Sequence, residues 1–309
     1  VGAPPPPPPL PLSPSPLHWY DAVLDVVAFS DVLRGGWALR FAPSLRHTRA
    51  GTPAPPPASA ASATADDVWS PIGVDAVGES SDAVVGVLGQ YNTGKTFLLN
   101  MLTGLSLPSS KRVATRGLSL RRAAGLAGTM PLMLVDSEGT LAPAPLEPAH
   151  ALLEKHATEE LLEHLTVSVS DYVLYVVEGF SSVDQRAVHR HAQYIGSSSK
   201  RFRELIVVHN LRTVADDGSL WHRWRTQVTE LYGRGAECTS SVHVAAAGAD
   251  GGAQLEAREA RWLQTSTARH LVLANHASPF GEAHNRATAA LLRQWVQSSV
   301  HVAGSRAAI

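Results

Sequence analysis

One short segment constrains the fold of this chain more than any other. Residues 89–96 read GQYNTGKT, which fits the pattern G-x-x-x-x-G-K-[ST], with the apolar run AVVGVL before it and FLLNML after it. In such a segment the glycines let consecutive backbone N–H groups point at one anion, and the following helix adds the positive end of its dipole. Because the pattern has this meaning only between a strand and a helix, it predicts an α/β fold with a phosphate site at their junction.

The positions of this loop have separate expected roles. Lys95 should reach the β- and γ-phosphates of a nucleoside triphosphate, and the hydroxyl of Thr96 should bind Mg²⁺. The loop and the residue that follows it are expected to surround the phosphates. The nucleotide-binding residues predicted here are Gly89, Gln90, Tyr91, Asn92, Thr93, Gly94, Lys95, Thr96 and Phe97.

Apolar, strand-like runs alternate with helical patterns through the rest of the chain. This alternation predicts an α/β P-loop NTPase fold, with a mostly parallel, doubly wound sheet and helices on both faces. An antiparallel hairpin of residues 118–121 and 132–135 is expected at one edge of the sheet. Strands are predicted at 83–88, 131–135, 172–177, 205–208 and 270–274, and helices at 96–102, 150–165, 182–195, 219–232 and 285–300.

The N-terminal part of the chain has a different composition. Fourteen of the 21 prolines fall within residues 1–57, which favours a disordered polyproline II segment that could also bind an SH3- or WW-type partner. Apolar residues at helical spacing predict one amphipathic helix over residues 17–33, packed on the main domain or docked on a membrane or partner. We therefore expect a proline-rich extension over residues 1–66 and a P-loop domain over residues 67–309.

Two further motifs follow the loop in the order that nucleotide hydrolysis requires. Thr115 and Arg116 belong to a T-R-G segment, in which the threonine can close on the γ-phosphate and complete the Mg²⁺ shell. The segment D-S-E-G ends a predicted strand. Asp136 would hold Mg²⁺ through water, and the N–H of Gly139 would sense the γ-phosphate. The predicted metal-binding residues are therefore Thr96, Thr115 and Asp136.

The strings GQYNTGKTFLLNMLTG, TRG and LMLVDSEG together resemble the G domain of the guanylate-binding protein and atlastin branch of the dynamin-like large GTPases. The resemblance extends over roughly residues 82–213. It implies a Mg²⁺-dependent GTPase with GTP as its nucleotide. It also implies a homodimer in which the G domains meet across their nucleotides.

This chain departs from that family at positions that matter for hydrolysis. The family's loop arginine, which acts as an internal arginine finger, is Asn92 here, and its switch serine is Val113. A finger arginine supplies roughly 10³–10⁵-fold in rate, so the resemblance implies slow hydrolysis unless Arg116 or another cation substitutes. Glu138 is retained and could organise the attacking water. The predicted catalytic residues are Lys95, Asn92, Thr115, Arg116 and Glu138.

The choice of base depends on the end of the strand LIVVHN. Asn210 fits the N-K-x-D pattern of guanine-reading segments, and Arg212 fits the T-L-R-D pattern of the family that the chain resembles. Both patterns place Thr213 where an aspartate belongs. One hydroxyl cannot accept hydrogen bonds from two guanine donors as a carboxylate does, so discrimination against adenine should weaken. Asp216 or Asp217 could replace the missing carboxylate, and the later segment Asn275-His276 could cap the base.

The function predicted from these residues is a GTP-binding protein that hydrolyses GTP slowly and acts as a dimerising switch. An ATPase or a promiscuous NTPase is the alternative if Thr213 does not specify guanine. A nucleotide-dependent scaffold without turnover is the alternative if the loop arginine is indispensable.

Composition excludes several other classes of protein. A net charge of −1 argues against a nucleic-acid grip, and no uncharged apolar run reaches the roughly 18 residues that a membrane span needs. The single cysteine, Cys238, excludes an internal disulfide and fits a reducing, cytoplasmic compartment. The 14 histidines are expected to be solvated or capping residues. Trp221 and Trp224 are expected to face the core, and Glu159, Glu160 and Glu163 to form a solvated helix face.

Overall fold

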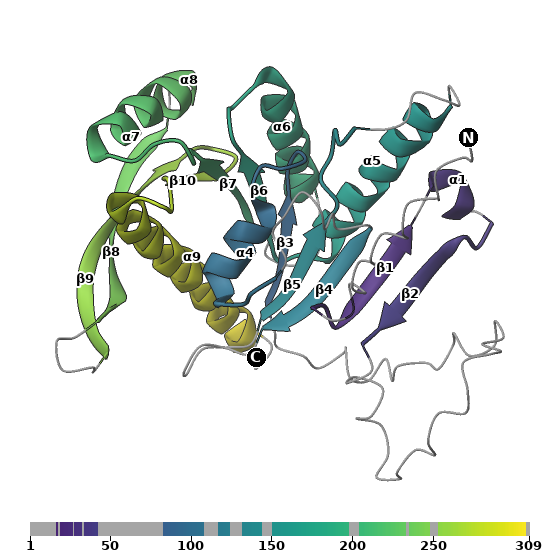
Figure 1. Cartoon of the computed structure of the whole chain (residues 1–309), viewed down its shortest axis with the longest axis horizontal. Helices are drawn as coiled ribbons and strands as arrows, with labels where there is room; N and C mark the ends of the chain where they lie inside the picture. The colour runs from purple at the N-terminus through teal and green to yellow at the C-terminus, as the bar shows by residue number, and fades with distance from the viewer. Residues whose placement is uncertain are drawn as a thin grey trace, which may run out of the picture.

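The structure is a computed structural model in which the described residues form one mixed sheet (Figure 1). Within them the sheet has 10 strands in the order β2-β1-β4-β5-β3-β6-β7-β10-β9-β8. The described residues are 17, 19–26, 28–32, 34–42, 83–107, 117–123, 132–143, 150–197, 204–232, 235–247 and 253–306.

The centre of the sheet is parallel, as predicted. Strand β3 pairs with β5 on one side and with β6 on the other, β6 pairs with β7, and β7 pairs with β10, all in parallel register. These strands are rich in Val, Leu and Ile and are almost wholly buried, as expected for strands covered on both faces. Their bounds are Ala83–Leu88 (β3), Leu132–Ser137 (β5), Tyr172–Val177 (β6), Glu204–Asn210 (β7) and Arg269–Leu273 (β10).

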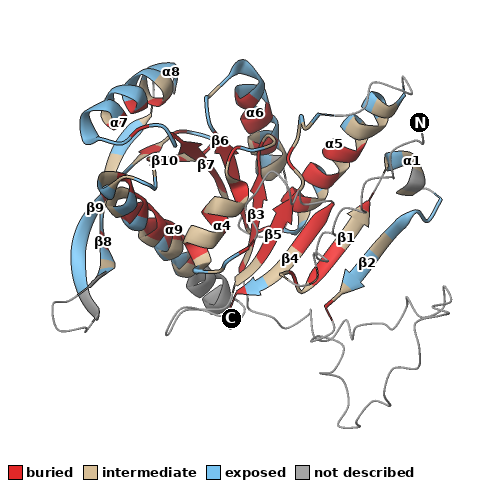
Figure 2. Ribbon diagram, in the orientation of Figure 1, coloured by how far each residue is buried: buried red, intermediate tan, exposed pale blue. Residues whose placement is uncertain are grey.

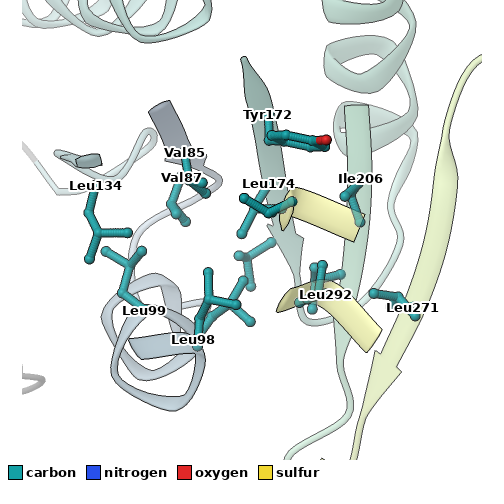
Figure 3. Packing of buried hydrophobic residues seen from close by; sticks show 14 of the residues in the cluster. Val85, Val87, Leu98, Leu99, Leu134, Tyr172, Leu174, Ile206, Leu271 and Leu292 are labelled. Atoms are coloured by element: carbon teal, nitrogen blue, oxygen red, sulfur yellow. The ribbon is translucent and has the colours of Figure 1, made fainter. Parts of the chain in front are cut away.

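Helices cover both faces of this parallel region, which confirms the predicted α/β P-loop NTPase fold. On one face α4 and α9 pack against alternate strand residues, among them Val85, Leu174 and Ile206 (Figure 3). On the other face α5 and α6 pack against the intervening residues, such as Tyr175 and Val207. Helix bounds are Lys95–Thr103 (α4), Ala151–Val169 (α5), Ser182–Ser197 (α6), Asp217–Trp224 (α7), Arg225–Thr229 (η3, a π-helical turn), Glu230–Tyr232 (α8) and Pro279–Arg306 (α9).

One edge of the sheet is antiparallel, and part of it was predicted wrongly. Strand β4 (Leu118–Ala123) pairs antiparallel with β5, which confirms the expected hairpin. The expected helix over residues 17–33 is wrong. It is replaced by β1 (Ala22–Val26), which lies between β4 and β2 (Trp37–Phe41), and by the short helix α1 (Phe29–Val32).

The physical reason for this correction is the pairing partner of β1. A short apolar segment fits both a helix and a strand, and β4 offers an open edge with which the segment can form backbone hydrogen bonds. A domain boundary near residue 67 would leave β1 and β2 outside the sheet that they extend. The predicted proline run and linker lie outside the described residues.

The other edge is a long antiparallel hairpin that was not predicted. Strands β8 (Ala236–Ala247) and β9 (Ala253–Gln264) pair along their whole length, and β9 joins the sheet through β10. The outer part of this hairpin is mostly exposed (Figure 2). Its base is held by Trp262, whose ring meets that of Trp295 on α9 edge-on at 5.1 Å. Within the described residues, no helix combines the length and the apolar character needed to cross a bilayer.

Candidate nucleotide site

The loop 89–96 connects the end of β3 to the beginning of α4. The loop backbone is left-handed at Asn92 (φ 64°) and at Gly94 (φ 95°), directly before the first helical residue. A Cβ on Gly94 would collide with the side-chain amide of Asn210, so only glycine fits here. This turn leaves the first backbone N–H groups of α4 without helical acceptors, which is the arrangement that binds an anion.

Lys95 lies back along the loop rather than out in solvent. Its Nζ donates hydrogen bonds to the carbonyl oxygens of Gly89, at 3.1 Å, and Gln90, at 2.9 Å. Burial lowers the pKa of Lys95 from its ordinary value, whereas the nearby charges of Asp136 and Glu138 act to raise it. A buried ammonium held mainly by carbonyl oxygens can gain a strong counterion from a phosphate group.

The D-S-E-G segment packs directly against this loop. The backbone N–H of Tyr91 donates to the carbonyl of Thr140 at 2.7 Å, and the N–H of Thr140 donates to the carbonyl of Gly89 at 3.3 Å. A Cβ on Gly139 would lie 2.7 Å from Lys95 Nζ, so this glycine permits the close approach of the two segments. The residues expected to sense the γ-phosphate are therefore adjacent to the loop lysine.

The expected Mg²⁺ ligands include two residues that the structure brings together. The hydroxyl of Thr96 lies 3.4 Å from Oδ2 of Asp136, a carboxylate that is only 1% exposed at the end of β5. Hydroxyl and carboxylate oxygens fit the ligand preference of Mg²⁺. Thr115 and Arg116 lie outside the described residues. Among the described residues, no group of three or more His, Cys, Asp or Glu side chains could hold a metal ion.

Besides Lys95, two of the predicted catalytic residues are described, and neither of these two carries a positive charge. Asn92 is exposed at the tip of the loop. Glu138 is partly buried, and its Oε2 accepts a hydrogen bond from the Gly117 N–H at 3.4 Å. Its Oε1 pairs with Lys155 of α5 at 3.4 Å. Glu138, the first residue after β5, is therefore held between Gly117, which precedes β4, and Lys155 of α5.

At the expected base end, Asn210 does not face the solvent. It is 4% exposed, and its Nδ2 donates to the carbonyl of Thr93 at 2.8 Å, which ties the end of β7 to the phosphate loop. Arg212 and Thr213 are exposed. The guanidinium of Arg212 is paired with Glu178 at 2.8 Å.

The two aspartates expected to replace the missing carboxylate already have partners. Asp216 caps α7 by accepting a hydrogen bond from the Ser219 N–H at 2.8 Å, and this bond lowers the pKa of Asp216. Asp217 accepts a hydrogen bond from Trp221 Nε1 at 2.7 Å. Each carboxylate would have to exchange this partner for a base.

The segment Asn275-His276 lies at the same end of the sheet. The N–H of Asn275 donates to the carbonyl of Val214 at 2.7 Å, so the loops after β7 and β10 are joined. The ring of His276 lies 5.3 Å from that of Phe97, directly after the phosphate loop. The structure therefore places the alternative base-capping segment beside the predicted nucleotide-binding residues.

Sequence reasoning missed three polar residues of this region, Ser181, Asp184 and Tyr20. Gln90 donates from Nε2 to Asp184 Oδ1 at 2.8 Å, and Asp184 is held in turn by the N–H and hydroxyl of Ser181. The spacing of Ser181 and Asp184 is that of a capping box, a signal that could have identified them. Tyr20 donates to Asp136 at 2.7 Å, and no local sequence signal could have revealed this contact.

Several side chains that were expected to be solvated are buried in the structure. The solvated-face prediction is wrong for Glu159 and Glu163, which are both buried. Glu159 accepts a hydrogen bond from the Leu141 N–H at 3.2 Å, and Glu163 pairs with Arg190 of α6 at 2.6 Å. Burial raises the pKa of Glu163, although Arg190 opposes this. The tryptophan prediction is confirmed for Trp224, which is buried.

The prediction of solvated histidines is wrong for His191, His209 and His270, which are all buried. His209 Nε2 and His270 Nδ1 lie 3.1 Å apart on β7 and β10. Burial lowers the pKa of His191 to about 4 and that of His270 to about 3, and it places the pKa of His209 well below its ordinary value. These histidines are neutral parts of the core.

Comparison with known proteins finds a family match over the part of the chain that contains the phosphate loop. Residues 84–210 match the family described as 50S ribosome-binding GTPase. A heat shock protein of Dictyostelium discoideum is 26% identical over 215 residues, an alignment that covers 67% of this chain and 31% of that protein. The chain therefore spans about a third of the length of this relative.

Solved structures resemble parts of the chain. Era in complex with MgGDPNP and nucleotides of 16S ribosomal RNA has 18% identity and a TM-score of 0.36, with coverage of 49% of this chain and 47% of Era. A GTP-binding protein from the archaeon Sulfolobus solfataricus, in complex with GDP, has 16% identity and a TM-score of 0.36, with coverage of 71% of this chain and 52% of that one. Alignments this loose assign no function to the chain.

The family match supports a P-loop GTPase domain, which confirms the broader part of the sequence resemblance. The narrower assignment to the guanylate-binding protein and atlastin branch is not supported, because the matching family is a different one. The site geometry agrees with the broader class, since loop, lysine and D-S-E-G segment converge as they do in P-loop GTPases.

Proposed function

We propose that this protein binds GTP with Mg²⁺ at the loop 89–96 and hydrolyses it slowly. One observation carries the proposal: buried Lys95, the N-terminus of α4 and Gly139 meet at one point, and Asn210 braces the loop there. An ammonium and the backbone N–H groups that open a helix together favour an anion with several oxygen atoms, as in a phosphate chain. The family match at residues 84–210 supports GTP as that anion.

The proposed roles follow the positions of the residues. Lys95 and the backbone N–H groups that open α4 hold the phosphates, and the N–H of Gly139 lies on the γ-phosphate side. Thr96 and Asp136 would hold Mg²⁺, with Thr115 as a further ligand. When bound, Mg²⁺ would neutralise phosphate charge during transfer.

Hydrolysis is proposed to be slow because the loop supplies no arginine finger. In the resemblance to guanylate-binding proteins and atlastins, Asn92 takes the place of the loop arginine, and it carries no charge. Glu138 is held by Gly117 and Lys155, a position from which it can organise water but cannot neutralise developing charge. If Arg116 supplied the missing cation, Arg116→Ala would lower the single-turnover rate toward that of a scaffold without turnover.

The first test is the affinity for labelled GTP, measured by calorimetry or fluorescence with Mg²⁺ and with EDTA. Lys95→Ala should lower the affinity by about 100-fold or more, because the loop ammonium is the main charged contact with the phosphates. Lys155→Ala is the matched control, since it removes a lysine of the neighbouring helix and should change the affinity by less than about threefold. Folded wild-type protein that binds no purine triphosphate would refute the proposal.

A second candidate function is a nucleotide site that does not distinguish GTP from ATP. The exposed Thr213, with Asp216 and Asp217 both engaged elsewhere, favours this alternative. Competition of unlabelled GTP and ATP for the same site distinguishes the two functions. A GTP preference above about 100-fold would reject the alternative.

Dimerisation through the G domain stays a prediction of the family resemblance, as does a switch function. Sedimentation with GDP and with a non-hydrolysable GTP analogue tests both. A change from monomer to dimer that depends on the γ-phosphate would support a dimerising switch. An unchanged sedimentation coefficient would contradict it.

A further inference from the structure

The N-terminal strand brings a phenol hydroxyl to the predicted metal site. Tyr20 lies two residues before the start of β1, and its hydroxyl donates a hydrogen bond of 2.7 Å to Oδ2 of Asp136, 116 residues away in sequence. Both residues are buried, at 4% and 1% exposure. The same carboxylate oxygen lies 3.4 Å from the hydroxyl of Thr96. Asp136 is therefore contacted from two sides, by the phosphate-loop helix and by the N-terminal segment.

The chain around Tyr20 is fixed firmly to the sheet. The backbone N–H of Asp21 donates to the carbonyl of Leu120 at 2.9 Å. The carboxylate of Asp21 pairs with Arg121 at 2.8 Å and accepts the N–H of Arg122 at 2.7 Å. The ring of Tyr20 belongs to the core cluster that also contains Leu99. These contacts place the hydroxyl before any metal binds, so little conformational entropy is lost at Asp136 on binding.

We propose that Tyr20 is a positioning residue for the Mg²⁺ carboxylate, an inference that rests on the proposed nucleotide function. A hydrogen bond from a neutral donor holds the Asp136 carboxylate in one orientation, with Oδ2 fixed by the Tyr20 hydroxyl. Loss of such an outer-shell partner typically lowers metal affinity about 10- to 100-fold. The contact therefore makes a residue of the N-terminal segment part of the nucleotide site.

A second contact ties the same strand to the region near the first switch. Gly117 follows Thr115 and Arg116 directly, and its α-carbon is so close to the Leu24 carbonyl of β1 that an added Cβ would collide with it. Gly117 is also hydrogen-bonded with Glu138 through both backbone groups. The N-terminal segment thus contacts both Asp136, through Tyr20, and the residue that follows the expected first switch, through Leu24.

The test is the Mg²⁺ dependence of nucleotide affinity in the Tyr20→Phe variant of the 309-residue chain. This variant keeps the buried ring and removes only the hydroxyl. Half-maximal GTP affinity should require about tenfold more Mg²⁺, while the affinity in EDTA stays that of wild type. Tyr172→Phe is the matched control, because Tyr172 is also buried and donates to a main-chain carbonyl, that of Trp295 at 3.0 Å, away from the site. It should leave the Mg²⁺ titration unchanged.

A double variant distinguishes positioning from a general effect on the fold. In an Asp136→Asn background, Tyr20→Phe should produce no further shift in the Mg²⁺ titration, because its route through the carboxylate is gone. An equal loss of affinity with and without Mg²⁺, or an unchanged Mg²⁺ titration in Tyr20→Phe, would overturn the inference and leave the proposed function standing. Wild-type protein that binds no nucleotide would overturn both.

Discussion

The phosphate end and the base end of the proposed site differ in how their side chains are held. At the phosphate end Lys95 and Asn210 are buried and bonded to loop carbonyls. At the base end Arg212 and Thr213 are exposed, and Arg212 pairs with another surface side chain, that of Glu178. The chain thus fixes the position of a triphosphate more firmly than the identity of the base that it carries.

This difference follows from the parts of the fold on which each end is built. The phosphate loop lies between β3 and α4, and the D-S-E-G segment and the end of β7 close on it, so three elements restrain it. The base end consists of the loops after β7 and β10, which are joined to one another by backbone hydrogen bonds. Backbone bonds hold the shape of a pocket, whereas selection among bases needs a specific side chain.

The largest effect is expected from a change that damages the phosphate end alone. Gly94→Ala forces a side chain into a left-handed position and into the Asn210 amide, so the loop should open. We expect GTP and ATP affinities to fall together by about 100-fold. Gly104→Ala, at the other end of α4, is the matched control. Its φ of 72° is also left-handed, but an added Cβ would meet no atom within 4 Å.

Calorimetric titration measures the nucleotide affinity of the two glycine variants, and urea unfolding measures their stability. Both variants should lose about 1 kcal/mol or more of stability from the left-handed backbone. Only Gly94→Ala should lose nucleotide affinity. Equal affinities in the two variants would show that the phosphate end does not depend on the close packing described here.

A smaller effect is expected from acid, which should act on the core beneath both ends. Burial lowers the pKa of His191 to about 4 and that of His270 to about 3. In the unfolded chain both histidines are protonated near pH 6.5, so the folded protein binds these protons only at a lower pH. Their contribution to stability is complete above about pH 6.5 and is lost as the pH falls. Between about pH 7.5 and about pH 5 each histidine should account for about 2 kcal/mol of lost unfolding free energy.

Urea unfolding at these two pH values checks the prediction. The raised pKa of Glu163 acts in the opposite direction and reduces the total loss. His191→Gln should remove about 2 kcal/mol of the pH dependence. The ratio of GTP to ATP affinity should not change with pH. A changed ratio would mean that one end of the site titrates by itself.

The same contrast separates what could be predicted from the sequence from what could not. The loop 89–96, the parallel strands and the hairpin of β4 and β5 are encoded by local patterns, so their positions could be predicted. The segment 22–26 could not be assigned to a strand, because a few apolar residues satisfy both periods and β4 decides between them. The contact of Tyr20 with Asp136 depends on a distant pairing that no local spacing encodes.

The burial of polar side chains could not be predicted from the sequence either. Glu159 and Glu163 lie on α5 among charged neighbours, which is typical of a solvated face. Their partners lie in other segments: the Leu141 N–H donates to Glu159 at 3.2 Å, and Arg190 of α6 pairs with Glu163 at 2.6 Å. At the base end, the replacement of an aspartate by Thr213 could be read directly, but the partners of Asp216 and Asp217 depend on the position of α7.

The smallest effect tests the base end directly. Thr213→Asp would introduce a carboxylate at the position that reads guanine in the N-K-x-D pattern, where it could accept two hydrogen bonds from the base. Such a contact should raise the preference for GTP over ATP by about tenfold and leave the affinity for inorganic triphosphate unchanged. Thr213→Asn is the matched control, because the asparagine side chain has nearly the same shape as that of aspartate and lacks its charge. If competition titrations give both variants the same GTP preference, residue 213 does not face the base, and the weak point of this end lies elsewhere in the loops after β7 and β10.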